Sequence, residues 1–282
     1  MDLISQNTLY KNGDIDCFDY TDDSKTDLLN DFEYAIKTVG FFKIDNLLNS
    51  QDLIRSLISD LEVLFEAHEA STTANKFPDI VHQLLGRGES FLELVLDPTI
   101  NEYAEKILSS TCIIHSYNAV KLMPLRANNA TKIHRDSPRF YTQNYPLCLQ
   151  ALVCLDPFTL DNGATYLLPG SHHLPAKPTD EYFYKNAIRI CANPGDVIFF
   201  DSLIWHTGGV NRTNLPRRAI TIVYNRSFMR QQIDLVKAIS SEYIEKMPPL
   251  VKKLIGMNVR VPASRDEFFL PEEARLYKAN QG

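Results

Sequence analysis

The chain has 282 residues, of which 44% are hydrophobic and 23% charged, and its formal net charge is −6. This composition is ordinary for a globular protein, and the negative charge argues against binding to duplex nucleic acid, which needs an excess of Lys and Arg. No segment approaches the roughly 18–20 apolar residues of a membrane span. We therefore expect neither a nucleic-acid nor a membrane partner.

Localisation is predicted from two features. The first residues, Met1-Asp-Leu-Ile-Ser-Gln, have neither the basic start nor the apolar stretch of a signal peptide. The cysteines are scattered, odd in number and without a C-x-x-C pair: Cys17, Cys112, Cys148, Cys154 and Cys191. This pattern is typical of reduced thiols rather than a disulfide framework, and it predicts a cytoplasmic protein.

The first third of the chain predicts helices that pack outside a sheet. Residues 1–23 are polar and acidic, without a clear period. Apolar residues then recur at helical spacing between Ser24 and Gly40, and again after Ser50, which offers an N-cap. A short apolar strand at residues 41–44 separates these two helices.

Residues 70–90 are expected to be irregular, and a segment of this kind can fold over the mouth of an active site. Asp97 and Pro98 then predict the start of another helix. From Thr111 to Leu122 the apolar period changes to two, which indicates a strand. One face of this strand carries His115, Tyr117, Ala119 and Lys121, and the other carries Ile114, Ser116, Asn118 and Val120.

Short strands separated by Gly and Pro turns dominate the middle of the chain. We expect them at residues 147–155, 164–168, 187–192, 197–200 and 217–225. Many short strands without crossover helices are typical of a jelly roll. The predicted fold class is therefore mainly β with flanking α-helices, a cupin-like double-stranded β-helix.

The pattern returns to helix after Asn225, with one helix expected at residues 234–246. The tail, with its aromatic residues Phe268 and Phe269, could cover the barrel, line a substrate mouth or mediate dimerisation. We expect residues 1–282 to form a single domain. Its parts are an N-terminal helical buttress (1–110), a jelly-roll core (111–226) and a C-terminal helical or irregular extension (227–282).

Three residues in the core have the spacing of an iron site. His134 and Asp136 are two apart, and in an extended segment such residues point to the same side. With His206 arriving from a distant strand, they would form the 2-His-1-carboxylate face that holds non-haem Fe(II). Three protein ligands leave open positions for a bidentate co-substrate and O₂.

Arg217 follows His206 on the strand predicted at residues 217–225. A guanidinium group is planar, always charged and bidentate, so it suits the binding of a carboxylate. Arg217 and Arg218 point to opposite faces of a strand, so only one of them can enter the barrel.

Four features in this order resemble the phytanoyl-CoA dioxygenase superfamily. They are His134-x-Asp136, the Asn162–His172 segment, the Pro194–Asp201 segment, and His206 with Arg217. The resemblance covers residues 112–226 and implies an oxygenase that uses Fe(II), 2-oxoglutarate and O₂ and releases succinate and CO₂. It implies that His134, Asp136 and His206 hold the metal and that Arg217, by its spacing from His206, binds the far carboxylate of 2-oxoglutarate.

The resemblance also bears on finer points. Related iron halogenases replace the carboxylate by a small residue, so Asp136 favours hydroxylation. It assigns His172 and His173 to a structural loop near the site. Gly208 stands where some relatives carry a serine that helps to hold the co-substrate. We expect Tyr117, Lys121 or Gln150 to supply that hydrogen bond instead, although core packing or ordinary surface placement explains these three almost as well.

The expected substrate is a small-molecule metabolite, either natural-product-like or amino-acid-like, with an acyl-CoA or carrier-bound acyl group as the alternative. Lys132, Arg135 and Arg139 beside the metal motif either attract an anionic substrate or form a solvated surface cluster. Two other classes remain open at this point: a cupin-like hydrolase or isomerase with another metal, and a non-catalytic binding module. The sequence is compatible with a monomer or a homodimer.

Overall fold

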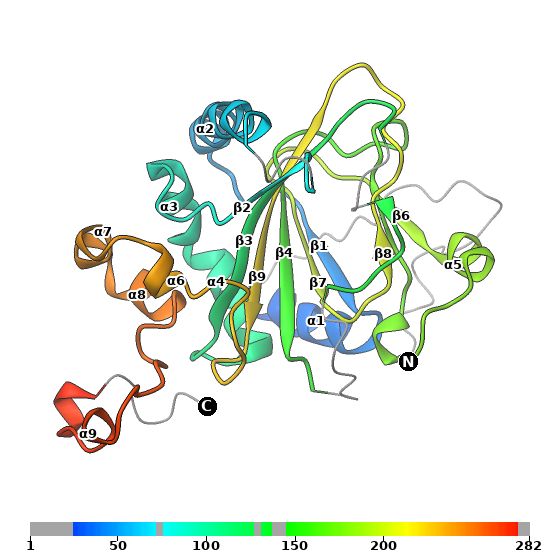
Figure 1. The fold of residues 1–282 in the computed structure, drawn as a ribbon. Coiled ribbons are helices and arrows are strands. Elements are labelled where there is room, and N and C mark those ends of the chain that lie inside the picture. Colours follow the sequence, from blue (N-terminus) through cyan, green and yellow to red (C-terminus); the bar gives the residue numbers. More distant parts are fainter. Residues whose placement is uncertain (1–24, 72–75, 127–130, 137–144, 276–282) are drawn as a thin grey trace.

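The computed structural model describes residues 25–71, 76–126, 131–136 and 145–275. Two antiparallel sheets dominate the described part of the chain (Figure 1). The large sheet contains, in spatial order, β1 (Phe41–Ile44), β7 (Val197–Asp201), β4 (Cys148–Cys154), β9 (Arg217–Asn225), β3 (Ile113–Leu122) and β2 (Ile80–His82). The small sheet contains β6 (Ile188–Ile190), β5 (Thr165–Leu167) and β8 (His206–Thr207). Together they form the jelly roll that the sequence predicts.

Helices cover the outer face of the large sheet (Figure 1). They are α1 (Lys25–Thr38), α2 (Gln51–Glu69), α3 (Glu89–Val95), α4 (Pro98–Leu108), α6 (Leu235–Ala238), α7 (Ser241–Lys246) and α8 (Pro249–Leu254). α5 (Asp180–Asn186) lies beside the small sheet, and α9 (Arg265–Phe268) lies near the C-terminus. No helix within the described ranges is long and apolar enough to cross a bilayer.

Alternation along the strands divides the core into two clusters. Phe199, Ile222 and Tyr224 point outward and pack with the helices, whereas Leu152 and Phe200 point into the space between the two sheets. Every residue of β4 is buried, because helices cover one face and the small sheet faces the other. Phe32 of α1 contacts the Phe199 ring with a centroid separation of 5.3 Å, which fixes this helix on β7.

Several segments differ from the sequence-based expectation. The large sheet takes β1 and β2 from the N-terminal third, so the sheet is not confined to residues 111–226. The irregular segment before residue 90 contains β2 and leads into α3. The single C-terminal helix is instead divided into α6 and α7. The extended backbone of Ile239 ends the first, and the Ser240 side chain caps the second by accepting a hydrogen bond from the backbone N–H of Tyr243. The arm at residues 1–23, Cys17 and Arg139 lie outside the described residues.

Candidate active site

A short antiparallel bridge brings His134 beside His206. The backbone N–H of each residue donates to the carbonyl of the other at 3.0 Å, and the two imidazole centroids are 4.2 Å apart. Asp136 is held two residues further on, where its N–H donates to the carbonyl of Ser202 at 3.1 Å. Residues 72 positions apart in sequence therefore meet because the chain closes the jelly roll at this point.

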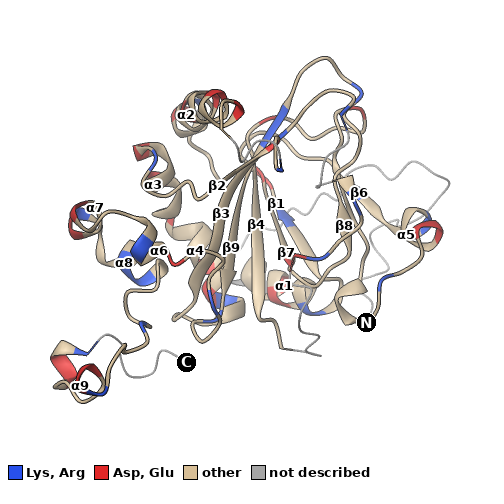
Figure 2. Ribbon diagram, in the orientation of Figure 1, with Lys and Arg blue, Asp and Glu red and all other residues tan. Residues whose placement is uncertain are grey.

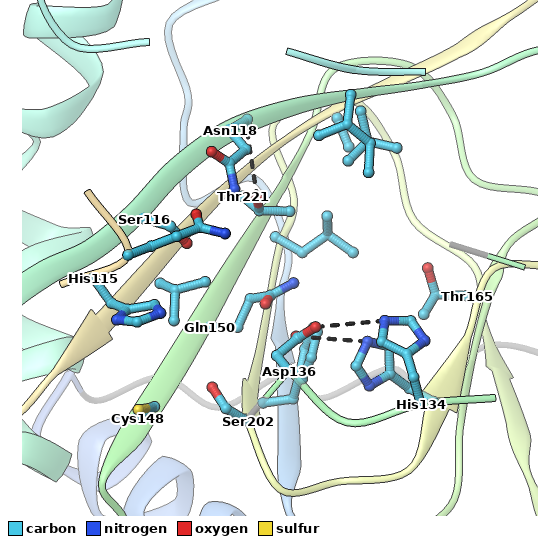
Figure 3. A pocket seen from close by; sticks show the side chains of 18 of the residues that line it. His115, Ser116, Asn118, His134, Asp136, Cys148, Gln150, Thr165, Ser202 and Thr221 are labelled. Carbon is cyan, nitrogen blue, oxygen red and sulfur yellow. Dashed lines mark hydrogen bonds and ion pairs between the residues drawn. The ribbon is translucent and has the colours of Figure 1, made fainter. Parts of the chain in front are cut away.

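Asp136 faces His134 (Figure 3), and its other carboxylate oxygen faces His206. Nε2 of His134 is 3.4 Å from Oδ1 of Asp136, and Nε2 of His206 is 3.6 Å from Oδ2. One ligand atom from each residue lies within 4.8 Å of the other two. Such a convergent set of two imidazoles and one carboxylate fits an Fe(II) ion.

Backbone carbonyls orient both imidazoles. Nδ1 of His134 lies 2.6 Å from the carbonyl of Lys132, and Nδ1 of His206 lies 3.0 Å from that of Ile204. A proton on Nδ1 that is donated to a carbonyl leaves the Nε2 lone pair directed at the centre of the site. This second layer of contacts is typical of metal-binding histidines.

The pKa values of His206 and Asp136 also suit metal binding, which requires neutral imidazole and ionised carboxylate. Burial lowers the pKa of His206 to about 4. Burial raises the pKa of Asp136, but the nearby His206 and His134 outweigh this effect and hold that pKa below its usual value. The pKa of His134 is raised, because contact with Asp136 outweighs the burial that would lower it.

Arg217 is the buried cation of the site, with only 4% of its surface exposed. Its Nη1 donates to the carbonyl of Gly163, and its guanidinium lies 3.9 Å from the ring centroid of Phe158. Burial lowers its pKa to about 10, so it remains charged at neutral pH. Among the described residues Arg217 forms no ion pair, and its Nε has no hydrogen-bond partner. A buried, charged guanidinium without an ion-pair partner is suited to binding an anionic ligand.

One cavity of about 330 Å³ joins these elements. Its lining includes His134, Asp136, His206, Arg217 and Gln150. Gly208 lines it too. Thr165 lies beside Gly208, since Tyr166 pairs with Thr207 in the antiparallel register. The hydroxyl of Thr165 is a site group that the sequence reasoning missed, although it belongs to the Asn162–His172 segment.

The predictions for Tyr117 and Lys121 were wrong. Both side chains lie on the helix-covered face of β3: the Tyr117 hydroxyl donates to the carbonyl of Phe91, and Lys121 Nζ lies 2.6 Å from Glu62. The face that lines the cavity is the other one, with Ser116 and Asn118. The alternation of residues along β3 could not identify the face that lines the cavity, because both faces of this strand are covered by other parts of the protein.

Four of the five remaining histidines lie in two places. His82 and His115 line the cavity, and His82 was not expected there because its segment was predicted to be irregular. His172 and His173 lie away from the triad, where both approach the carbonyl of Lys37. They line a separate cavity of about 290 Å³ with Asp201. Arg135 stacks on Trp205 at 4.4 Å and contacts backbone carbonyls, so it supports the loop around the site.

A jelly roll that holds two histidines, an aspartate and a buried arginine in one cavity defines the class of the iron- and 2-oxoglutarate-dependent oxygenases. The model of the phytanoyl-CoA dioxygenase (PhyH) family matches residues 36–219, and the chain belongs to this family. It is a 2-oxoglutarate-dependent dioxygenase that uses Fe(II), 2-oxoglutarate and O₂.

The chain is similar to several individual proteins. The uncharacterized protein Rv1501 of Mycobacterium tuberculosis is 33% identical over 198 residues, which cover 68% of this chain and 71% of the relative. Dioxygenase trt7 of Aspergillus terreus is 30% identical over 189 residues, 61% of this chain and 63% of trt7. The crystal structure of the epimerase SnoN with Fe3+, alpha ketoglutarate and nogalamycin RO has the same fold. Its TM-score is 0.59 at 20% identity, and the match covers 71% of this chain and 84% of SnoN.

Proposed function

We propose that this dioxygenase hydroxylates a small-molecule metabolite, with Fe(II) held by His134, Asp136 and His206. The observation that carries the proposal is the convergence of one ligand atom from each residue within 4.8 Å. When bound, Fe(II) with 2-oxoglutarate and O₂ supplies the oxidising chemistry, and succinate and CO₂ are released. The residues of the chain supply geometry, charge and an enclosing cavity.

Arg217 is proposed to bind the far carboxylate of 2-oxoglutarate. It is buried, charged and without an ion pair among the described residues, so a carboxylate would complete its hydrogen bonds. Thr165 is proposed to donate a second hydrogen bond to the same co-substrate, in the place that Gly208 leaves without a side chain. Thr165 is only 5% exposed and lines the cavity, and its hydroxyl has no hydrogen-bond partner among the described residues.

Hydroxylation is favoured over halogenation because the carboxylate of Asp136 occupies the position that a halide would need. A small-molecule substrate is supported by the size of the cavity, about 330 Å³. It is also supported by SnoN, whose structure contains nogalamycin RO. An acyl-CoA or carrier-bound acyl group is the second candidate.

The test is single-turnover chemistry under controlled oxygen. Protein loaded anaerobically with Fe(II) and 2-oxoglutarate is exposed to ¹⁸O₂ with a pool of candidate metabolites, and succinate and the metabolites are analysed by mass spectrometry. We expect one labelled oxygen atom in succinate and one in the product. A product that has lost two hydrogens and gained no oxygen would show that the enzyme desaturates its substrate rather than hydroxylating it. Absence of succinate would contradict the oxygenase role of this site.

A further inference from the structure

The cavity extends beyond the space that 2-oxoglutarate needs. Arg217 lies opposite Leu122 at one end of β9, and Val223 lies opposite Ser116 and Gln150 six residues further along the same strand. At about 3.4 Å per residue this is roughly 20 Å, whereas a five-carbon diacid spans about 6 Å, given C–C bonds near 1.5 Å. The Arg217 side chain and 2-oxoglutarate together are shorter than this distance. Space therefore remains at the end of the cavity where Gln150 lies.

Gln150 and Ser116 lie level with the proposed metal ligands. Gln150 pairs with Phe200 of β7, and the Phe200 ring is 5.0 Å from that of His206. Figure 3 shows the Gln150 amide beside Asp136, with Ser116 on the neighbouring part of the wall. A substrate that approaches the metal from this end would therefore pass these two side chains.

Gln150 carries an unused hydrogen-bonding group into the cavity. The residue is only 7% exposed and lines the cavity, and its side-chain amide contacts no hydrogen-bond partner among the described residues. Ser116 is 8% exposed, and its hydroxyl also has no hydrogen-bond partner among the described residues. Thr221 differs, because its hydroxyl donates to the carbonyl of Asn118. The amide faces the open cavity, so Gln150 can offer both a donor and an acceptor to a ligand there.

Apart from the proposed metal ligand Asp136, the described side chains of the wall at this end are neutral. Its described residues include Ser116, Cys148, Gln150, Met229 and Gln232. His115 also lies there, and burial lowers its pKa, so its ring is neutral near pH 7. The charged residues of the protein lie mainly on helices and connecting segments, and the strands of the large sheet are largely uncharged (Figure 2).

We infer that this end of the cavity binds an uncharged substrate group rich in carbonyl, hydroxyl or amide functions, and that Gln150, with Ser116, determines this specificity. The inference rests on the proposed function, because it assumes that Arg217 and the metal triad take up 2-oxoglutarate. It disfavours a carboxylate or phosphate next to the metal. An acyl-CoA substrate would have to bind with its phosphate groups away from this end of the cavity.

The experiment compares matched pairs of small carboxylic acids and their primary amides, measured by ligand-observed NMR. The protein carries diamagnetic Zn(II) in place of Fe(II) and saturating 2-oxoglutarate. We expect the amides to bind more tightly than the acids, and Gln150→Leu to weaken amide binding by about tenfold, which corresponds to about 1.4 kcal/mol. Ser116→Ala should weaken it less. Gln51→Leu, at an exposed position on α2, is the matched control and should change nothing.

The outcomes separate this inference from the proposed function. Tighter binding of the acids, no amide binding at all, or unchanged amide binding in Gln150→Leu would overturn the inference. The same samples report 2-oxoglutarate binding, which Gln150→Leu should preserve. If the wild-type protein fails to bind 2-oxoglutarate, the proposed function itself fails, whatever the amides do.

Discussion

Arg217 and Arg218 are neighbours on β9, but their guanidinium groups have opposite environments. Arg217 points into the cavity and forms no ion pair among the described residues. Arg218 points to the outer face, where it makes a bidentate contact with Asp156 at 2.7 and 2.8 Å and a further contact with Glu62 at 3.0 Å. The first cation is available for a ligand, and the second fastens β9 to a loop and to α2.

This difference predicts separate effects of two alanine substitutions. Arg217→Ala should raise the KM for 2-oxoglutarate by at least about tenfold, because hydrogen bonds to charged groups are worth roughly 1.5–3 kcal/mol. Arg218→Ala should leave that KM within about twofold and instead lower the free energy of unfolding by roughly 1 kcal/mol, since its ion pairs are partly exposed. Initial-rate kinetics and urea unfolding distinguish the two. Equal effects on KM would show that Arg217 has been assigned the wrong role.

Thr165 provides a finer test of co-substrate binding. Thr165→Val keeps the shape of the side chain but removes the hydroxyl, so the KM for 2-oxoglutarate should rise about three- to tenfold, as expected for one hydrogen bond. Thr165→Ser should retain most of the affinity. Thr221→Val is the control, because its hydroxyl already bonds to a backbone carbonyl within the cavity wall. A Thr165→Val protein with wild-type KM would remove Thr165 from the co-substrate site.

Asp201 predicts a pH dependence of stability that is independent of the metal site. Burial raises its pKa from 3.8 to about 6, although the N–H of Leu203 donates to its carboxylate. The folded state therefore binds a proton that the unfolded state releases, and stability is lost as the pH rises from about 4 through about 6. Asp201→Asn keeps the hydrogen bond to Leu203 without the buried charge. Its stability relative to the wild type should increase by up to roughly 3 kcal/mol between pH 4 and pH 7.

Chemical or thermal unfolding at several pH values measures this difference directly. The comparison is made between the two proteins at each pH, so that titration of other groups cancels. A difference that stays constant from pH 4 to pH 7 would mean that the Asp201 carboxyl has an ordinary pKa in the folded protein.

The local sequence pattern was sufficient for some parts of this structure and insufficient for others. The bridge between His134 and His206 was foreseeable, because the motif spacing requires a distant strand to return to the same place. The strands of the jelly roll were foreseeable from their turns. The inner face of β3 was not, since helices cover its Tyr117 side and the small sheet faces its Ser116 side, so both sides look apolar or mixed in the sequence.

Tertiary contacts explain the remaining differences. β2 is a strand because it pairs with Val120, Ala119 and Asn118 of β3, and nothing in its own three residues requires this. His82 thereby enters the cavity wall. Thr165 becomes a site residue only when β5 lies beside β8. These relationships depend on residues far apart in the chain, which a local period cannot specify.

The central claim is that His134, Asp136 and His206 together hold Fe(II), and anaerobic equilibrium dialysis against Fe(II) tests it most directly. We expect one iron per wild-type chain, a loss of affinity of at least about tenfold in His206→Ala, as is usual when a ligand or its support is removed, and unchanged affinity in His173→Ala. His206→Ala protein that binds Fe(II) as tightly as the wild type would contradict the account.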